Sequence, residues 1–133
     1  EVVGVEPNPR MATWAMRHTG CPVLASLGQV EQMFDLVVMH DVLEHMENPR
    51  EALLAAGARV HPGGFVIVDT PDLGAVDWNH EGMAWKHFRP LEHLWYFEDR
   101  HLMELLVRSD FVPRCVDRPI PGKLVVYAQR RGF

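Results

Sequence analysis

Apolar residues occur along this chain in short runs that end abruptly in polar side chains. The clearest run is residues 36–39 (LVVM), which His40 and Asp41 follow directly. A continuous apolar run of this length predicts a strand that is buried on both faces. Residues 65–68 (FVIV) form a second run of the same kind, followed by Asp69. Shorter apolar segments at residues 1–5 and 21–25, and two more at 111–116 and 123–128, are also predicted strands.

Three segments combine helix-start signals with apolar residues at helical spacing. The Asn-Pro pairs at residues 8–9 and 48–49 are typical of an N-cap followed by the first helical position. The first helix is expected to end at Gly20 in a left-handed cap. The second should run to about Val60, where the turn sequence HPGG begins, and Gly57 within it allows close approach to a sheet. The third helix is predicted over residues 99–108.

The predicted order is therefore β-α-β-β-α-β, a long irregular segment over residues 71–96, and then α-β-β. Such alternation predicts an α/β fold with a mainly parallel sheet and helices on both faces. The turn-rich residues 117–122 (DRPIPG) predict a C-terminal antiparallel hairpin, which would add an antiparallel edge strand. A length of 133 residues predicts a single domain. The irregular segment is long for a compact domain, and such segments usually serve function.

Composition and charge argue against several kinds of partner. The chain has 13 Lys and Arg against 18 Asp and Glu, a net charge of −5 with no basic run, so nucleic acid is not an expected partner. The longest apolar runs are far short of the ~20 residues of a membrane helix, and no secretory leader is expected. Cys21 and Cys115 fit no metal-binding spacing and are expected to be reduced thiols, which suits a cytoplasmic protein.

Four segments, in this order, resemble class I S-adenosylmethionine-dependent methyltransferases of the small-molecule type. They are VVGVEPNP (2–9), FDLVVMHDVLEHMENP (34–49), ARVHPGGFVIVDTP (58–71) and EHLWYFEDRHLMELLVRSDF (92–111). The resemblance implies a Rossmann-like α/β fold with S-adenosylmethionine as cofactor. It also implies transfer of a methyl group from sulfur to an oxygen, nitrogen or carbon atom of a small-molecule acceptor.

The same resemblance implies roles for single residues. Glu6, at the end of the first predicted strand, would accept hydrogen bonds from both ribose hydroxyls. The family contacts the adenine ring after the next strand, which here means residues 25–27, and the methionine moiety at the end of the strand over residues 34–39. The cofactor-binding residues implied in this way are Glu6, Pro7, Ser26, Leu27, His40 and Asp41.

The chain departs from the family at one motif. These enzymes carry a first strand that ends in an Asp/Glu-x-Gly-x-Gly loop, which holds the methionine part of the cofactor, and the sequence contains no such loop. Gly63 and Gly64 belong to a predicted turn instead. We therefore expect residues 1–133 to form a single methyltransferase-like domain that is incomplete at its N-terminus. We also expect this chain alone to bind S-adenosylmethionine poorly.

The eight histidines allow two interpretations near the acceptor. His45, His87 or His93 could act as a general base that removes a proton from the acceptor. Alternatively, the pairs Glu44-His45 and Glu92-His93 could hydrogen-bond loops to the edge of the sheet. Acceptor contacts are expected within residues 71–96, the substrate-side loop. The predicted substrate residues are Trp85, His87, Glu92 and His93.

Aromatic residues of this loop also allow two interpretations. Trp78 and Trp85 could form walls of an acceptor pocket or simply cover the sheet edge, and Trp85 is the better pocket candidate. Trp95 and Tyr96 run into the next helix and are expected in the core.

Metal binding is a further possible role for the histidines and acidic residues. If residues 40–45 were helical, His40 with Glu44 and Asp41 with His45 would have the spacing of metal ligands, and the long loop could add His80, His87 and His93. The residue order is not H-E-x-x-H, however, and His40 closes a strand, so no metal site is expected.

Methyl transfer from S-adenosylmethionine to a small-molecule acceptor is therefore the predicted function. One alternative is a non-catalytic module that keeps the fold and works through an interface, which the missing glycine-rich loop favours. A second alternative is a metal-dependent hydrolase built on the His, Asp and Glu residues. Neither the acceptor nor the oligomeric state is predicted by the sequence.

Overall fold

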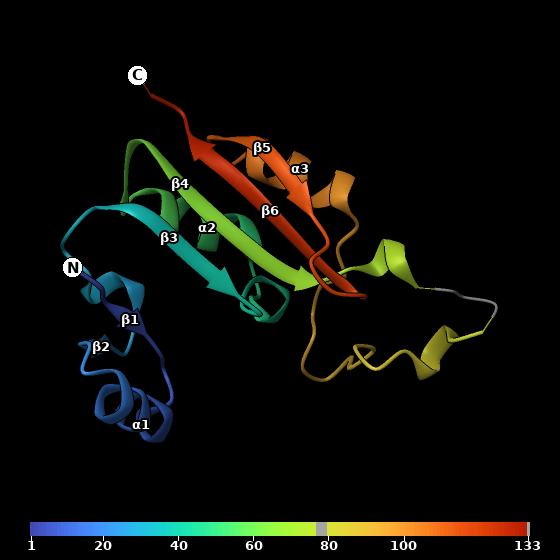
Figure 1. Ribbon diagram of the computed structural model, residues 1–133, viewed down its shortest axis with the longest axis horizontal. Coiled ribbons are helices and arrows are strands. Elements are labelled where there is room, and N and C mark those ends of the chain that lie inside the picture. Colours follow the sequence, from blue (N-terminus) through green and yellow to red (C-terminus); the bar gives the residue numbers. More distant parts are fainter. Residues whose placement is uncertain (77–79, 133) are drawn as a thin grey trace. The chain divides into compact units, whose positions relative to one another are not determined.

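A computed structural model describes residues 1–76 and 80–132 of the chain (Figure 1). The chain divides into two compact units, Glu1–Gln32 and Met33–Phe133. No helix in the described parts of the chain is both long enough and apolar enough to cross a membrane.

The first unit consists of a helix and two very short parallel strands. Strand β1 (Gly4–Val5) pairs with β2 (Val23–Leu24), and helix α1 (Pro9–Thr19) connects them. The Asn8 side chain accepts hydrogen bonds from the first backbone N–H groups of α1, and Gly20 ends the helix at φ 70°. Both ends of this helix are therefore as predicted. The strands are shorter than predicted, because only two residues of each form the ladder.

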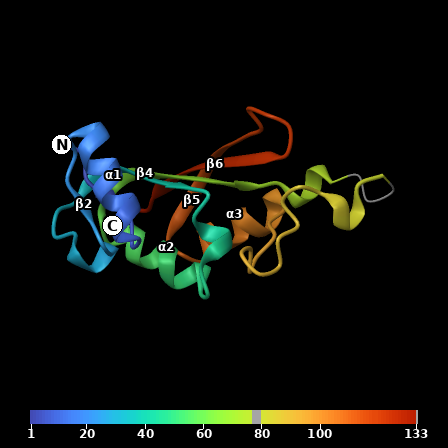
Figure 2. The same ribbon diagram turned by 90° about the horizontal axis from the view of Figure 1, so that it is seen from below.

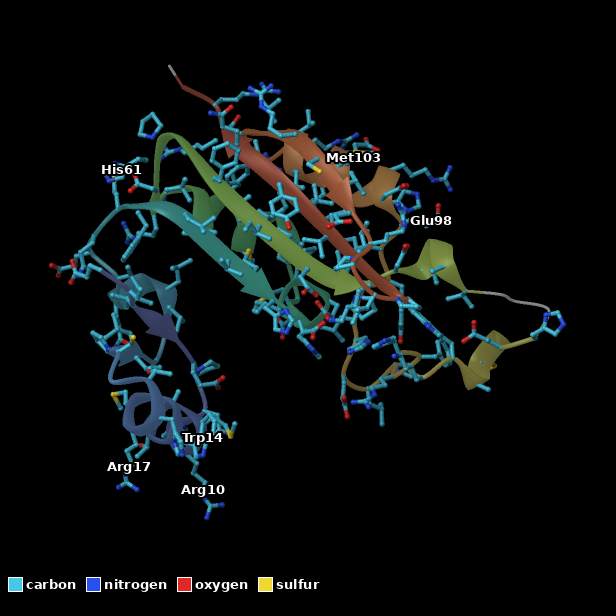
Figure 3. All side chains as sticks on the ribbon, in the orientation of Figure 1. Arg10, Trp14, Arg17, His61, Glu98 and Met103 are labelled. Carbon is cyan, nitrogen blue, oxygen red and sulfur yellow. The ribbon has the colours of Figure 1, made fainter. Side chains whose placement is uncertain are left out.

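One face of α1 is exposed and carries both apolar and basic side chains. Arg10, Trp14 and Arg17 project from the helix on the side away from β1 (Figure 3). Trp14 is 56% exposed and stacks on His18, with ring centroids 4.1 Å apart.

The second unit contains a four-stranded mixed sheet in the order β3-β4-β6-β5. Its strands are β3 (Phe34–His40), β4 (Val60–Pro71), β5 (Phe111–Asp117) and β6 (Lys123–Arg130). Strands β3 and β4 are parallel, and β6 is antiparallel to both β4 and β5. The predicted α/β fold with a C-terminal antiparallel hairpin is confirmed. The last strand lies inside the sheet, however, and β5 forms the edge.

Both helices of the second unit cover the same face of this sheet (Figure 2). They are α2 (Pro49–Gly57) and α3 (Asp99–Val107), which contact each other as well as the strands. The core between helices and sheet contains fully buried apolar side chains, among them Leu53, Leu102, Leu106, Val66, Val126 and Phe111. This packed core holds in place the strands at whose ends the polar residues lie.

The opposite face of the sheet contradicts one prediction. Leu36 is 47% exposed and Val38 is 57% exposed, so β3 is not buried on both faces. Side chains alternate along a strand, and α2 and α3 both lie on the other side, so these residues have no covering helix from this unit. Phe65 on β4 lies opposite Leu36 and is 39% exposed for the same reason.

The junction between α2 and β4 also differs from the prediction. The helix ends at Gly57, and β4 begins at Val60 and includes the HPGG sequence that was predicted to be a turn. The β3–β4 register jumps here, from Phe34 opposite Val60 to Leu36 opposite Phe65. Gly64 permits this bulge, because a Cβ atom there would lie 2.8 Å from the carbonyl oxygen of Asp35.

Pro71, the first residue of the predicted irregular segment, is the last residue of β4. The described parts of this segment contain two 3₁₀ turns, η3 (Leu73–Ala75) and η4 (Gly82–Ala84), and an isolated bridge between Asp72 and Phe97. Trp78, one of the aromatic residues considered as a pocket wall, lies outside the described residues.

Candidate functional site

Polar side chains at the ends of β3 and β4 form an ionic cluster. His40 lies opposite Asp69 in the parallel register, and its Nδ1 is 2.7 Å from Asp69 Oδ2. Lys123, at the start of β6, donates to Asp69 Oδ1 at 3.0 Å and also to Asp41 Oδ1. Asp41 has φ 48°, a left-handed conformation in which the chain turns out of the strand. The sequence predicts His40 and Asp41 at a strand end, but no pattern in it points to Lys123.

Lys123 dominates the ionisation of this cluster. Burial opposes the charge on Asp41, but the hydrogen bond and positive charge of Lys123 outweigh it and hold the pKa of this carboxyl below its usual value. Burial likewise opposes the charge on Lys123, but its hydrogen bonds to Asp41 and Asp69 raise its pKa above the usual value. The ammonium group therefore stays charged between two carboxylates.

Replacing Lys123 by Met should lower the free energy of unfolding by about 1–2 kcal/mol at pH 7. This range is discounted for solvent screening, because the Asp41 side chain is 41% exposed. A carboxyl group whose pKa is lowered in the folded protein stabilises the fold at pH values above its ordinary pKa of about 3.9. This contribution is lost as the pH falls. A lysine whose pKa is raised in the folded protein stabilises the fold at pH values below its ordinary pKa of about 10.4. This contribution is lost as the pH rises through the pKa of the folded state.

Urea titrations of wild type and Lys123→Met at pH 7 and pH 3 would measure this effect. The difference should shrink at pH 3, and Lys86→Met, which changes the exposed Lys86 outside the cluster, is the matched control. A loss of equal size at both pH values would mean that aliphatic packing, and not charge, is the cause.

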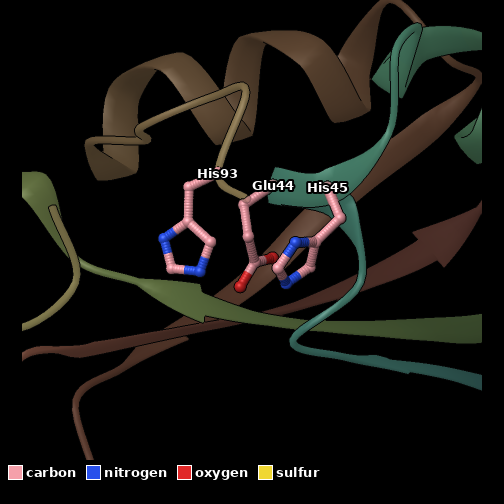
Figure 4. A group of neighbouring side chains, drawn as sticks. All are labelled: Glu44, His45 and His93. Carbon is pink, nitrogen blue, oxygen red and sulfur yellow. The ribbon is translucent and has the colours of Figure 1, made fainter. Parts of the chain in front are cut away.

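A second cluster lies in the turn after β3 and combines a carboxylate with two imidazoles (Figure 4). Glu44 and His45 belong to the 3₁₀ turn η2 (Leu43–His45), and His93 comes from the segment before α3. One ligand atom from each of the three side chains lies within 4.8 Å of the others. Glu44 and His93 are 1% and 7% exposed, whereas His45 is exposed. The backbone joins the two segments, because Leu94 N–H donates to the carbonyl oxygen of Glu44 at 2.8 Å.

Backbone carbonyl groups orient both imidazoles. His45 Nδ1 is 2.8 Å from the carbonyl oxygen of Glu92, and His93 Nδ1 is 2.8 Å from that of His87. A carbonyl oxygen only accepts, so each Nδ1 carries the proton and donates. The Nε2 atom of each neutral ring is therefore the nitrogen with a lone pair.

Glu44, in the turn η2, is almost completely buried. Its Oε2 accepts a hydrogen bond from Thr70 Oγ1 at 3.2 Å, while Oε1 is buried with no hydrogen-bond partner among the described residues. Burial, with a further contribution from the negative charge of Asp41, raises the pKa of the Glu44 carboxyl. Thr70 was not singled out in the sequence, because nothing in the order of residues pairs it with Glu44.

His87 lies beside this cluster and differs from its neighbours. Its Nε2 is buried and has no hydrogen-bond partner in the part of the chain that the structure describes. Burial, followed by the charge of Lys86, lowers the pKa of His87, and burial also lowers the pKa of His93. The rings of His87 and His93 stack with centroids 6.4 Å apart.

The structure thus separates residues that the sequence grouped and joins others. Residues 40–45 are not an α-helix, so His40 does not face Glu44 at helical spacing: His40 and Asp41 belong to the ionic cluster, and Glu44 and His45 to the second one. In line with the alternative in which the Glu-His pairs tie loops to the sheet edge, Glu44 accepts from Thr70 of β4. His45 joins the turn to the loop at Glu92, whereas the bond of His93 to His87 lies within the loop itself. Glu92 lies at the surface, where its carboxylate pairs with Arg89 at 3.1 Å.

Two tryptophans of this part of the chain differ in burial. Trp85, the pocket candidate, is 5% exposed and packs edge-on against His87. Trp95, expected in the core, is 44% exposed, and its Nε1–H donates to the carbonyl oxygen of Met46 at 2.9 Å. Tyr96 is half-buried, with its hydroxyl accepting from the backbone N–H of Arg89. The prediction that Trp95 lies in the core is therefore wrong, because helix α3 begins only at Asp99.

The first unit holds the remaining predicted cofactor residues. Glu6 follows β1, and its Oε1 accepts a hydrogen bond from Asn8 N–H at 2.8 Å. Pro7 is exposed next to it. Ser26 and Leu27 follow β2, where the Gln29 side chain accepts from the backbone N–H of Ser26 and so shapes the turn. Every one of these residues stands just after the C-terminal end of a parallel strand.

A methyltransferase-domain family model matches residues 1–116. The chain belongs to this family of methyltransferase domains. The match covers the whole first unit and most of the second, and it ends before Lys123. No curated protein sequence matches the chain.

Solved structures of methyltransferases share this fold. A 1,6-didemethyltoxoflavin N1-methyltransferase from Burkholderia thailandensis, with S-adenosylhomocysteine bound, aligns with a TM-score of 0.69 and 20% identity over 98% of this chain. A methyltransferase from Thermotoga maritima aligns with a TM-score of 0.73 and 20% identity over 97% of this chain and 72% of its own. The magnesium protoporphyrin IX methyltransferase of Synechocystis gives 0.72 and 14% over 97% of this chain and 64% of its own. This chain spans 61% of the Burkholderia enzyme, and at these identities the likeness establishes the fold.

Proposed function

We propose that this protein takes part in methyl transfer from S-adenosylmethionine to a small-molecule acceptor. The observation that carries the proposal is the family match over residues 1–116. It is supported by the polar groups at strand ends, which is where ligands bind in open α/β sheets. The alternative of a non-catalytic module makes the opposite prediction, namely no methyl transfer by a fully folded protein.

In the first unit, Glu6 has the chemistry to hold a ribose. Only one of its carboxylate oxygens, Oε1, has a hydrogen-bond partner among the described residues, so the other is available to a ribose hydroxyl. We assign Pro7, Ser26 and Leu27 to apolar and backbone contacts with the adenosine, since each is next to a strand end. The missing glycine-rich loop does not change this fit, because Glu6 acts through its own side chain.

In the second unit, His40 and Asp41 are assigned to the methionine end of the cofactor. Asp41 offers a carboxylate to the methionine ammonium group, although Lys123 already neutralises part of its charge. The cofactor, when bound, supplies an electrophilic methyl group on a sulfonium. The protein then has to align the acceptor and exclude water from it.

On the acceptor side we assign Trp85, His87, Glu92 and His93, with His45 beside them. A base is needed only where the attacking atom carries a proton. His87 fits this role best among the three histidines, because its Nε2 is buried and has no partner among the described residues. Glu92 lies at the surface and is assigned to contact the acceptor where it enters.

Replacing Glu6 by Ala should weaken the binding of S-adenosylhomocysteine by about 10- to 100-fold, because hydrogen bonds to a charged group contribute about 1.5–3 kcal/mol. The measurement is calorimetry on the protein as its gene encodes it. Glu31→Ala, at an exposed carboxylate in the same unit, is the matched control and should bind like wild type. Equal affinity for Glu6→Ala and Glu31→Ala would contradict the assignment of Glu6.

The 133-residue chain should bind S-adenosylhomocysteine more weakly than about 100 µM, because it contains no glycine-rich loop. Micromolar binding by this chain alone would overturn that expectation. Transfer of labelled methyl groups to small-molecule acceptors by the protein as encoded would exclude the non-catalytic alternative.

A further inference from the structure

We propose that Glu44, His45 and His93 bind a divalent transition-metal ion, with zinc the best match. The site includes His45 and His93 of the proposed acceptor side, but zinc binding there does not require methyl transfer, because it follows from the positions of these side chains in the second unit. It replaces the sequence-based expectation of no metal, which rested on the residue order within residues 40–45 and did not single out His93 among the histidines of the loop.

The three side chains converge on one point. Their ligand atoms lie within 4.8 Å of one another, and Figure 4 shows the Glu44 carboxylate between the two imidazoles. Bonds of about 2.0–2.2 Å to a tetrahedral zinc ion would bring such atoms to about 3.3–3.6 Å from one another. The short turn η2 and the segment that carries His93 are already joined by the hydrogen bond from Leu94 to Glu44. A bound ion therefore has to draw together groups that are already neighbours.

Both imidazoles are prepared for metal binding by their other ring nitrogen. Histidines that bind metals almost always donate the second N–H to a carbonyl or carboxylate, which fixes the tautomer and the ring orientation. His45 and His93 each donate Nδ1–H to a backbone carbonyl at 2.8 Å, which leaves Nε2 with its lone pair. The backbone carbonyl groups of Glu92 and His87 therefore supply the outer shell that a histidine-based metal site requires.

The buried oxygen of Glu44 gives independent support. Glu44 is 1% exposed, yet its Oε1 has no hydrogen-bond partner among the described residues, while Oε2 is held by Thr70. A buried polar atom without a partner is costly, and such groups normally bond to protein, water or an ion. A cation between Glu44 and the imidazoles would satisfy this oxygen.

The ligand set favours zinc with an open coordination position. Two imidazoles and one carboxylate are a known catalytic zinc set, in which the fourth position holds water or substrate. His45 is exposed, so this position can face solvent. The other group of suitable side chains, His40, Asp41 and Asp69, is a weaker candidate, because the Lys123 ammonium already bonds both carboxylates.

Calorimetric titration of the chelator-treated protein with zinc chloride tests this proposal. We expect one zinc ion per chain, and about 100-fold weaker binding for Glu44→Gln and for His45→Gln, since even outer-shell changes cost about 10- to 100-fold. Glu44→Gln keeps the shape of the buried side chain, and His45 is exposed, so both variants should fold, which circular dichroism verifies. His61→Gln, an exposed histidine outside both clusters, should bind zinc like wild type.

Two results would overturn the proposal. One is the absence of zinc binding by the wild-type protein. The other is zinc binding that is lost in His40→Gln but kept in Glu44→Gln and His45→Gln, which would move the site to the ionic cluster. None of these measurements uses S-adenosylmethionine, so failure of the methyl-transfer proposal and failure of the zinc proposal are seen in different experiments.

Discussion

Phe111→Ala should lower the free energy of unfolding of the second unit by about 3–5 kcal/mol. Phe111 begins β5, is completely buried, and is the largest of the fully buried side chains. Its ring packs against Gly57 at the end of α2, where a Cβ atom would lie only 3.3 Å from the ring. Removing the ring leaves a cavity between helix and sheet that neither rigid element can close.

The expected loss is a large part of the stability of a whole domain, which is about 5–15 kcal/mol. Denaturant titration followed by far-ultraviolet circular dichroism measures it. Leu91→Ala removes an aliphatic side chain that is 98% exposed and should change stability by less than about 0.5 kcal/mol. If Phe111→Ala cost no more than Leu91→Ala, α2 and β5 would not be packed as described.

Arg118→Met is the second substitution with a large expected effect, a loss of about 2–3 kcal/mol at pH 7. Arg118 Nε donates to Asp72 Oδ2 at 2.7 Å, and Nη2 donates to Asp99 Oδ2 at 2.9 Å. The Asp72 side chain is 1% exposed, so the variant leaves a buried carboxylate without its cation. The range is below that of a fully buried pair, because the Arg118 side chain is 47% exposed and water can reach it.

The pH dependence identifies the part of this loss that comes from Asp99. The hydrogen bond from Arg118 lowers the pKa of the Asp99 carboxyl, so its contribution is present above the ordinary value of about 3.9 and disappears as the pH falls. Wild type and Arg118→Met should therefore differ less at pH 3 than at pH 7.

Arg100→Met is the matched control for Arg118→Met. Arg100 pairs with Glu98 at the surface, with 70% of its side chain exposed, so its loss should cost less than about 1 kcal/mol. Equal effects of the two substitutions would show that the buried Asp72 does not depend on Arg118.

Asp72 explains why this ion pair matters for the fold. It follows β4, and its backbone N–H donates to the carbonyl oxygen of Gly122 at 3.0 Å. Its Oδ1 accepts from Gly74 N–H and starts the turn η3. The pair therefore ties the end of β4 to the β5–β6 hairpin, next to the ionic cluster of Lys123.

Features that depend on neighbouring residues were predictable from the sequence. The Asn-Pro start of α1 and its end at Gly20 follow from local capping, which needs only a few consecutive residues. The apolar runs located β3 and the second half of β4, and the turn-rich DRPIPG segment located the hairpin. The order of these elements was enough to predict the α/β class.

Contacts between distant residues were not predictable in the same way. The insertion of β6 between β4 and β5 places Lys123 beside Asp41 and Asp69, and no spacing in the sequence encodes that register. The exposure of Trp95, which was expected in the core, was not predictable either, because burial in an irregular segment depends on what packs against it.

The sequence by itself determined the elements, their order and the polar residues that end each strand, because capping, periodicity and turn chemistry act over a few residues. Only the tertiary structure decided which of those polar residues meet. It separated His40 and Asp41 from Glu44 and His45, and it brought His93 to Glu44 from far along the chain. Such pairings are set by strand register and by the path of the connecting segments, and so they appear only when the whole chain is folded.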